Sequence, residues 1–192
     1  MHRFLFVTHS HNKLSEAERF LDMKLQHYGL DLPELQSVDV EEVAVHKVKY
    51  AYNVLQRPVM VDDTGLYVDA WNGLPGGLVK WFMQRVGDRG ICDMMQVAKE
   101  RTARAKTVVA TIDDEVNLNI YVGTMEGTIA PEPAGEGGYS WETIFIPNGS
   151  DRTVAQMTRE EKDHYSMRRV AFEALIRREE SMVPSVGALL ER

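Results

Sequence analysis

The chain has 192 residues, a formal net charge of −7, and a composition that is 44% hydrophobic and 27% charged. This balance is ordinary for a globular protein, and we expect one domain over residues 1–192. The acidic charge without a basic tract argues against duplex nucleic acid as a partner, and no apolar run reaches the roughly 18 residues of a membrane helix. The one cysteine, Cys92, excludes an intrachain disulfide, speaks against a cysteine-based zinc site and favours a reducing cytoplasm.

The first half of the chain alternates predicted strands with predicted helices. The apolar N-terminal segment has no small-residue cleavage site, and we interpret it as a strand rather than a signal peptide. Apolar residues at helical spacing, among them Leu14, Ala17 and Phe20, predict the first helix. In chain order we expect a strand at 3–8, a helix at 12–27, a strand at 37–40, a helix at 41–55 and a strand at 59–61.

The second half adds a β-hairpin, which makes the predicted sheet mixed. Its arms are rich in Val, Ile, Thr and Tyr and flank an acidic turn. In chain order we expect turns at 62–77, helices at 78–86 and 90–98, hairpin arms at 106–112 and 117–126, a strand at 143–146 and a helical segment at 158–178. The pattern predicts the α/β class, with a mixed sheet flanked by helices and ligands bound at strand ends.

The sequence THSHNK, residues 8–13, joins the first predicted strand to the first predicted helix. A helix N-terminus offers unpaired N–H groups and a partial positive charge, which suit phosphate, and Lys13 adds a full charge. The glycines and the Lys-Ser/Thr ending of a Walker A loop are missing. The segment is therefore either a phosphate site or only a capped helix start with a surface lysine. A metal site at His9 and His11 has no evident third ligand.

Two adjacent carboxylates, Asp62 and Asp63, follow an apolar strand and precede Thr64. Like charges this close repel each other unless a cation is near. Mg²⁺ prefers a few hard oxygens plus ligand phosphates, and Glu42 is a possible second ligand. One of these carboxylates could also activate water as a general base. The alternative is an Asp-rich turn in which Gly65 supplies unusual dihedral angles.

Two further loops carry glycines beside residues that could contact a ligand. NGLPGG, residues 72–77, is either a simple reversal or a close approach of backbone to a ligand, and the following Lys80 could reach a phosphate or stay solvated. GEGGYSWETIF, residues 135–145, places Tyr139 and Trp141 next to the carboxylate of Glu142. Two large rings in a glycine-rich loop suggest a surface on which a flat ligand could stack.

The segment TREEKDHYSMRR, residues 158–169, begins with a capping box. Lys162 and Arg168 are six residues apart, so on one straight helix they would point in different directions. Ser166 could cap a second helix and supply a break. The segment is therefore either two short helices that meet at a cationic corner or one charged, solvated helix face.

Together, and in this order, these segments resemble the motifs of the inosine triphosphate pyrophosphatase family. The family motifs are T-G-N-x-x-K, an acidic pair followed by Ser/Thr and a G-x-P-G turn, G-F/Y-G-W/Y-D-P-x-F, and E-x-x-E-K-N-x-x-S-H-R. The corresponding segments are THSHNK, DDTGLYVDAWNGLPG, GGYSWETIF and AQMTREEKDHYSMRR. The resemblance covers nearly the whole chain. It implies an elongated mixed sheet with two lobes around a central cleft, usually in a homodimer.

The resemblance also implies a reaction, the Mg²⁺-dependent hydrolysis of non-standard purine triphosphates (ITP, XTP, dITP) to monophosphate and pyrophosphate. It places the metal at Glu42 and Asp63 and water activation at Asp63, with Lys13 holding phosphates and Tyr139 stacking on the base. The substrate contacts that it implies are Thr8, His9, Ser10, His11, Asn12, Lys13, Thr64, Tyr139, Ser140, Trp141, Glu142, Lys162, Ser166, Met167 and Arg168.

The departures from the family motifs cluster in the half that reads the base. A glycine is replaced by Ser140, an aspartate by Glu142, and the histidine of Ser-His-Arg by Met167, which cannot donate a proper hydrogen bond. In the first motif His9 and Ser10 replace Gly-Asn. We therefore expect an active pyrophosphatase with an altered base preference. The alternative is a nucleotide-binding sensor or partner protein that does not hydrolyse its ligand.

Overall fold

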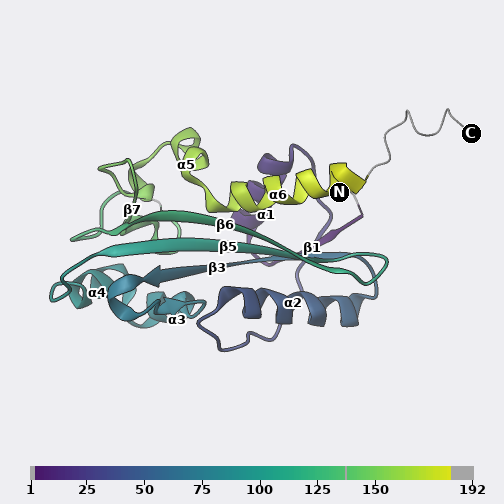
Figure 1. Ribbon diagram of the computed structural model, residues 1–192, viewed down its shortest axis with the longest axis horizontal. Coiled ribbons are helices and arrows are strands. Elements are labelled where there is room, and N and C mark those ends of the chain that lie inside the picture. The colour runs from purple at the N-terminus through teal and green to yellow at the C-terminus, as the bar shows by residue number, and fades with distance from the viewer. Residues whose placement is uncertain (1–2, 137, 183–192) are drawn as a thin grey trace, which may run out of the picture.

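The computed structural model describes residues 3–136 and 138–182 and shows a mixed β-sheet between two layers of helices (Figure 1). The strand order is β2-β1-β3-β5-β6-β7, and β4 pairs with β3. β1 runs parallel to β2 and β3, and the remaining pairs are antiparallel. The strands are β1 (Leu5–Val7), β2 (His27–Tyr28), β3 (Val59–Val68), β4 (Pro75–Gly76), β5 (Thr102–Ile112), β6 (Leu118–Ile129) and β7 (Phe145–Pro147). The predicted α/β class with a mixed sheet is confirmed.

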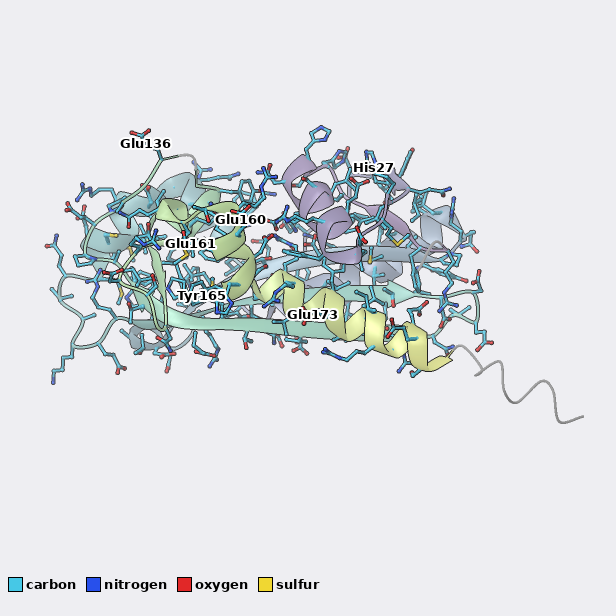
Figure 2. All side chains as sticks on the ribbon, turned by 90° about the horizontal axis from the view of Figure 1, so that it is seen from above. His27, Glu136, Glu160, Glu161, Tyr165 and Glu173 are labelled. Atoms are coloured by element: carbon cyan, nitrogen blue, oxygen red, sulfur yellow. The ribbon has the colours of Figure 1, made fainter. Side chains whose placement is uncertain are left out.

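Helices cover both faces of the sheet. One face carries α1 (His11–Leu21), α5 (Arg159–Tyr165) and α6 (Met167–Met182), and the other carries α2 (Val40–Leu55), α3 (Val79–Arg85) and α4 (Gly87–Met94) (Figure 1). Seen from above, α6 carries Glu173 and lies along the sheet, and α5, which precedes it in the chain, carries Glu160 and Glu161 (Figure 2). Within the described residues no helix combines the length and apolarity needed to cross a membrane.

The core forms where these helices press apolar stripes onto the sheet. The α2 helix buries Val40, Val43, Ala44, Val48 and Ala51 at helical spacing, and all of these except Val43 share one apolar cluster with residues of β3 and β5. On the opposite face α6 begins directly on β6. A Cβ atom at Gly123 would overlap the Met167 carbonyl oxygen, so glycine allows this close packing.

The strand β3 differs most from the sequence-based expectation. It runs from Val59 to Val68, whereas we expected a strand only over 59–61 and turns after it. The antiparallel ladder with β5 continues from Val59↔Ile112 to Val68↔Ala103, and this pairing overrides the local turn preference of Asp and Gly. The alternative of an Asp-rich turn is therefore wrong, because both aspartates lie within a strand.

Other element boundaries also moved. The expected strand at 37–40 is wrong, because Asp39 caps α2 there and the strand beside β1 is β2. α1 ends at Leu21, since Asp22 adopts a left-handed conformation with φ 49°. The expected strand at 143–146 starts later, as β7. The break at Ser166 is confirmed: it separates α5 from α6, and its Oγ accepts a hydrogen bond from Arg169 N at 3.2 Å.

Residues 1–2, 137 and 183–192 lie outside the described part of the chain. The expectation of one domain over 1–192 extends over these residues and stays a prediction. The strands of the described residues form one sheet, and each of the three buried apolar clusters includes residues of this sheet.

Candidate active site

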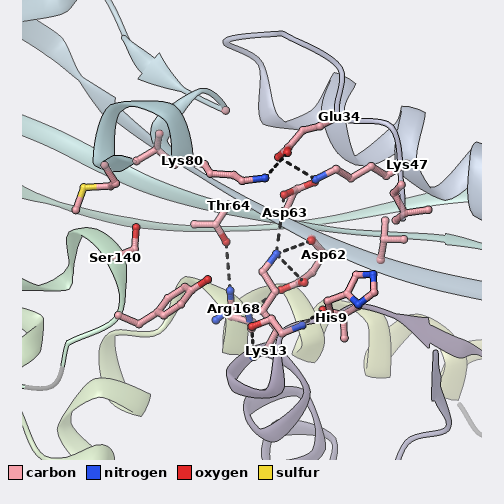
Figure 3. A pocket seen from close by; sticks show the side chains of 18 of the residues that line it. His9, Lys13, Glu34, Lys47, Asp62, Asp63, Thr64, Lys80, Ser140 and Arg168 are labelled. Carbon is pink, nitrogen blue, oxygen red and sulfur yellow. Dashed lines mark hydrogen bonds and ion pairs between the residues drawn. The ribbon is translucent and has the colours of Figure 1, made fainter. Parts of the chain in front are cut away.

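A cavity of about 560 Å³ lies beside the middle of β3 (Figure 3). β1 reaches only as far as the pair Phe6↔Met60, and β4 joins β3 at Leu66, so the described residues leave that side of β3 without a strand between these two points. The open side faces the start of α1. The predicted site residues that line the cavity are Thr8, His9, Ser10, Lys13, Asp63, Thr64, Tyr139, Ser140, Trp141, Glu142, Met167 and Arg168.

The two aspartates of β3 share Lys13 but differ in their shortest cationic contacts. Successive side chains of a strand point to opposite faces. Asp62 contacts Lys13, with Nζ 3.1 Å from Oδ1, and Arg168, with Nε 2.7 Å from Oδ2. Asp63 contacts Lys47 on α2, with Nζ 2.6 Å from Oδ2. Lys13 also lies 3.9 Å from Asp63 Oδ1. The repulsion expected between adjacent carboxylates is thus offset by cations that come from α1, α2 and α6.

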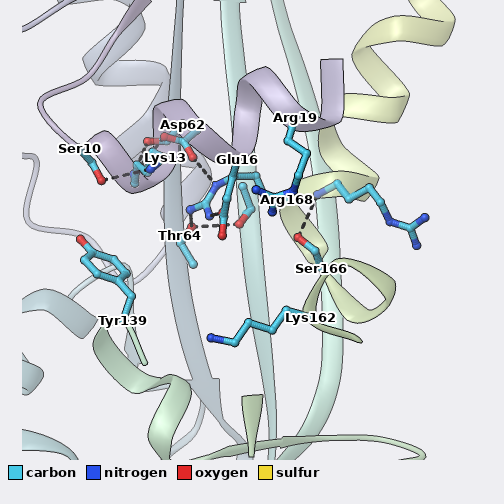
Figure 4. A network of polar contacts seen from close by, with 12 residues as sticks. Ser10, Lys13, Glu16, Arg19, Asp62, Thr64, Tyr139, Lys162, Ser166 and Arg168 are labelled. Carbon is cyan, nitrogen blue, oxygen red and sulfur yellow. Dashed lines mark hydrogen bonds and ion pairs between the residues drawn. The ribbon is translucent and has the colours of Figure 1, made fainter. Parts of the chain in front are cut away.

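Arg168 is the centre of a buried polar network (Figure 4). Besides Asp62, its guanidinium donates to Glu16 of α1 and to Thr64 Oγ1, the latter at 3.3 Å. Burial alone would raise the pKa of the Asp62 carboxyl, but the charges of Lys13 and Arg168 outweigh burial and hold that pKa below its usual value. Burial would likewise lower the pKa of Arg168, yet Asp62 and Glu16 raise it. Asp62 and Arg168 are therefore both charged in the folded protein.

A second chain of charges, which we did not predict as a unit, crosses the cavity from the other side (Figure 3). Lys47 lies between Asp63 and Glu34, whose Oε1 is 3.3 Å from the Lys47 ammonium. Lys80 of α3 lies 2.7 Å from the other oxygen of Glu34. Burial would lower the pKa of Lys47, but Asp63 and Glu34 raise it. The pKa of Glu34, which burial would raise, is lowered by Lys80 and Lys47.

The start of α1 is held by its own side chains. Ser10 is the N-cap and accepts from Lys13 N at 3.3 Å, and Ser10 N donates to Thr8 Oγ1 at 3.0 Å. Lys13 is not the solvated lysine of the simple cap interpretation, because its ammonium donates to the Asp62 carbonyl at 2.8 Å. His9 lines the cavity and pairs with exposed Asp31. The exposed side chains of His11 and Asn12 do not line it.

The aromatic loop is fixed by Glu142. A short 3-10 helix, η2 (Ser140–Thr143), follows Tyr139, and Glu142 Oε2 accepts from Tyr139 N at 3.1 Å and from Lys162 Nζ at 2.8 Å. Tyr139 remains 54% exposed and presents its ring at the cavity, whereas Trp141 is buried against Phe145 with the ring centroids 5.4 Å apart. The longer side chain of Glu142 therefore ties the loop to α5.

Met167 is buried in an apolar cluster with Trp141 and Phe145, and it also lines the cavity. Lys162 and Ser166 do not line the cavity, but they position residues that do: Lys162 holds Glu142, and Ser166 starts the helix that carries Arg168. Lys162 and Arg168 project from the two sides of the helix break (Figure 4). The corner expected from the sequence exists, with each cation paired to its own carboxylate.

Of the two expected metal ligands, Glu42 and Asp63, only Asp63 lines the cavity. Asp63 lines the cavity, but Glu42 is exposed outside it and accepts a hydrogen bond from Ser37 Oγ at 2.7 Å. Metal binding by Glu42 stays a prediction, and Glu34 is the glutamate that shares a cation with Asp63. Within residues 3–136 and 138–182, no three His, Cys, Asp or Glu side chains form a ready metal cage. Mg²⁺ needs no such cage, since it completes its shell with substrate phosphates and water.

A family model and several known proteins match most of this chain. A model of the Ham1 family matches residues 4–178. The chain is 38% identical over 169 residues to a dITP/XTP pyrophosphatase of Thermococcus kodakarensis, covering 86% of this chain and 91% of the relative. It is 36% identical over 177 residues to inosine triphosphate pyrophosphatase 1 of Trypanosoma cruzi, covering 91% and 90%. A HAM1 protein from Coxiella burnetii has the same fold, with a TM-score of 0.82 at 23% identity over 94% of this chain and 100% of that one.

Proposed function

This chain belongs to the Ham1 family, and on that premise we propose that it hydrolyses non-standard purine nucleoside triphosphates to a nucleoside monophosphate and pyrophosphate. One observation carries the proposal: a cavity with lysines and carboxylates at one end and an exposed tyrosine ring at the other. The charged end suits a polyphosphate, and the ring suits a base.

The phosphate end is built from three lysines on three helices. Lys13 of α1, Lys47 of α2 and Lys80 of α3 all line the cavity. These groups come from both sides of β3, so they can surround a triphosphate rather than contact it from one side. Positioning and charge neutralisation supply a large part of the catalysis of phosphoryl transfer.

The residues also fit a divalent cation. Asp62 Oδ1 and Asp63 Oδ2 are buried and accept no well-directed hydrogen bond from the described residues, although lysine ammonium groups lie 3.1 and 2.6 Å away. Glu34 adds a second cavity carboxylate beside Asp63. We propose that Asp63 and Glu34, rather than Glu42, hold Mg²⁺. When bound, Mg²⁺ would neutralise phosphate charge and orient a water molecule.

Asp62 and Asp63 have different roles in this proposal. Asp62 is 1% exposed and forms ion pairs with Lys13 and Arg168, so it positions these cations. Asp63 reaches the cavity and is the base that takes the proton from the attacking water. The water attacks the α-phosphorus, the bond from this phosphorus to the α,β-bridging oxygen breaks, and pyrophosphate leaves.

The base end explains why we propose an altered base preference. Tyr139 offers a ring for stacking, but the side chains that could read the edge of the base are committed elsewhere. Lys162 is paired with Glu142, and Arg168 is held by Asp62, Glu16 and Thr64. Met167 offers no proper hydrogen-bond donor. With few free donors, the site discriminates weakly between a 6-oxo and a 6-amino purine.

The test is a panel of purine triphosphates that includes inosine, xanthosine, guanosine and adenosine forms, with kcat/KM measured for each in the presence of Mg²⁺. We expect pyrophosphate release from the inosine and xanthosine substrates, with a smaller preference over adenosine than a site with free base-reading donors would give. Tight binding in calorimetry without any product would instead support the non-hydrolysing alternative.

We also propose a homodimer that works in the cytoplasm. The dimer rests on the family resemblance, and the compartment is supported by a single buried thiol, Cys92, that needs no oxidising environment. Light scattering on the purified protein tests the first point, since a mass near 21.8 kDa would indicate a monomer.

A further inference from the structure

Lys47 lies between the two carboxylates that we assign to the metal. Its ammonium is 2.6 Å from Asp63 Oδ2 and 3.3 Å from Glu34 Oε1. The three side chains come from α2, from β3 and from the loop that precedes α2. Lys80 of α3 pairs with the remaining oxygen of Glu34 at 2.7 Å. Two lysines thus already balance the charge of this carboxylate pair.

This arrangement makes the lysines competitors of a metal ion. Lys47 and Asp63 are each only 14% exposed, so water screens their attraction little. A cation bound to these oxygens would lie close to the Lys47 ammonium, and the two positive charges would repel each other. Metal binding by Asp63 and Glu34 therefore favours displacement of Lys47, and a displaced ammonium needs another anion in this cavity.

We propose that Lys47, assisted by Lys80, is an internal counterion that a divalent cation replaces, and that both lysines then pair with the phosphates of the substrate. The proposal rests on the proposed function, because it takes the metal and the polyphosphate as its ligands. In the absence of substrate the lysines weaken metal binding. With substrate present they gain new partners, so metal and polyphosphate bind more tightly together than apart.

The proposal makes a prediction of unusual sign: removing a lysine should improve metal binding. Mn²⁺, a spectroscopic substitute for Mg²⁺, is titrated into the nucleotide-free protein and its free fraction is followed by electron paramagnetic resonance. We expect Lys47→Met to lower the Mn²⁺ Kd by about 10-fold, within the roughly 5- to 150-fold range of coupled binding events. Lys80→Met, at a half-exposed position, should lower it less. Asp63→Asn should abolish the binding.

The matched control is Lys106→Met. Lys106 is also mostly buried and pairs with Glu41 of α2, but it does not line the cavity. An unchanged Mn²⁺ Kd in this variant shows that the effect is not a general response to net charge. If Lys47→Met does not fold, Lys80→Met decides the question. A Kd that is unchanged or weaker in the folded lysine variants overturns the proposal.

These measurements need no turnover, so they separate the two proposals. Tighter Mn²⁺ binding in Lys47→Met by a protein that hydrolyses no triphosphate would support the counterion exchange and refute the pyrophosphatase. Pyrophosphate release by a protein whose Mn²⁺ affinity does not respond to Lys47 would do the reverse.

Discussion

Replacement of Arg168 by methionine tests how the site is built. Arg168 is 11% exposed and donates to Asp62, Glu16 and Thr64, and Asp62 is 1% exposed. Methionine keeps most of the side-chain volume but leaves two carboxylates without this cation. Removing one partner of a buried ion pair costs about 3–5 kcal/mol, because the other charge stays buried. For a domain of this size, that loss corresponds to a decrease in Tm of about 6–20 °C.

The assay is urea unfolding followed by circular dichroism, with Arg177→Met as the control. Arg177 lies on the same helix, is 67% exposed and is 4.0 Å from Glu173, so its removal should change stability by no more than about 0.5 kcal/mol. Adding Asp62→Asn to Arg168→Met should recover part of the loss, since one unpaired charge is then gone. Arg168→Met with the stability of the Arg177 control would refute the buried network.

Three further predictions concern the base and the pH. Met167→His should shift the preference toward 6-oxo purines, and an unchanged ratio of inosine to adenosine triphosphate kcat/KM would contradict this. Tyr139→Ala should raise KM by about 5- to 150-fold, because base stacking contributes about 1–3 kcal/mol; an unchanged KM would remove Tyr139 from the base site. The pKa of Asp62 is held below its usual 3.8, so its contribution to stability is present above about pH 4 and is lost as the pH falls through the lowered pKa. The slope of unfolding free energy against pH below pH 4 should therefore be shallower in Asp62→Asn, and an identical slope would contradict the ionised pair.

Much of the site could be predicted from local sequence because its motifs act locally. Ser10 caps α1, Ser166 breaks the last helical segment, and Lys13, Asp63 and Tyr139 come to one cavity as expected. Each of these features depends on residues close in the chain or on an ordered series of motifs.

The rest depends on contacts between distant segments. The aspartates lie within β3 because β5 pairs with this segment. No residue near Asp62 in the sequence predicts that pairing. Glu34 lies in a loop without a recognisable sequence pattern, so its ion pair with Lys80 could be found only from the tertiary structure. Lys47 did carry a signal: it lies four residues after Val43 and seven after Val40, on the buried stripe of α2. A charged residue at such a position needs a buried partner, which here is Asp63.

We propose that this cavity is the site where a purine triphosphate is cleaved to the monophosphate and pyrophosphate. ³¹P nuclear magnetic resonance of inosine triphosphate incubated with the protein and Mg²⁺ tests it most directly. We expect inosine monophosphate and pyrophosphate in equal amounts, and a rate lower by orders of magnitude for a folded Asp63→Asn variant. Inosine diphosphate with orthophosphate, no turnover of any triphosphate, or an Asp63→Asn variant as fast as the wild type would contradict it.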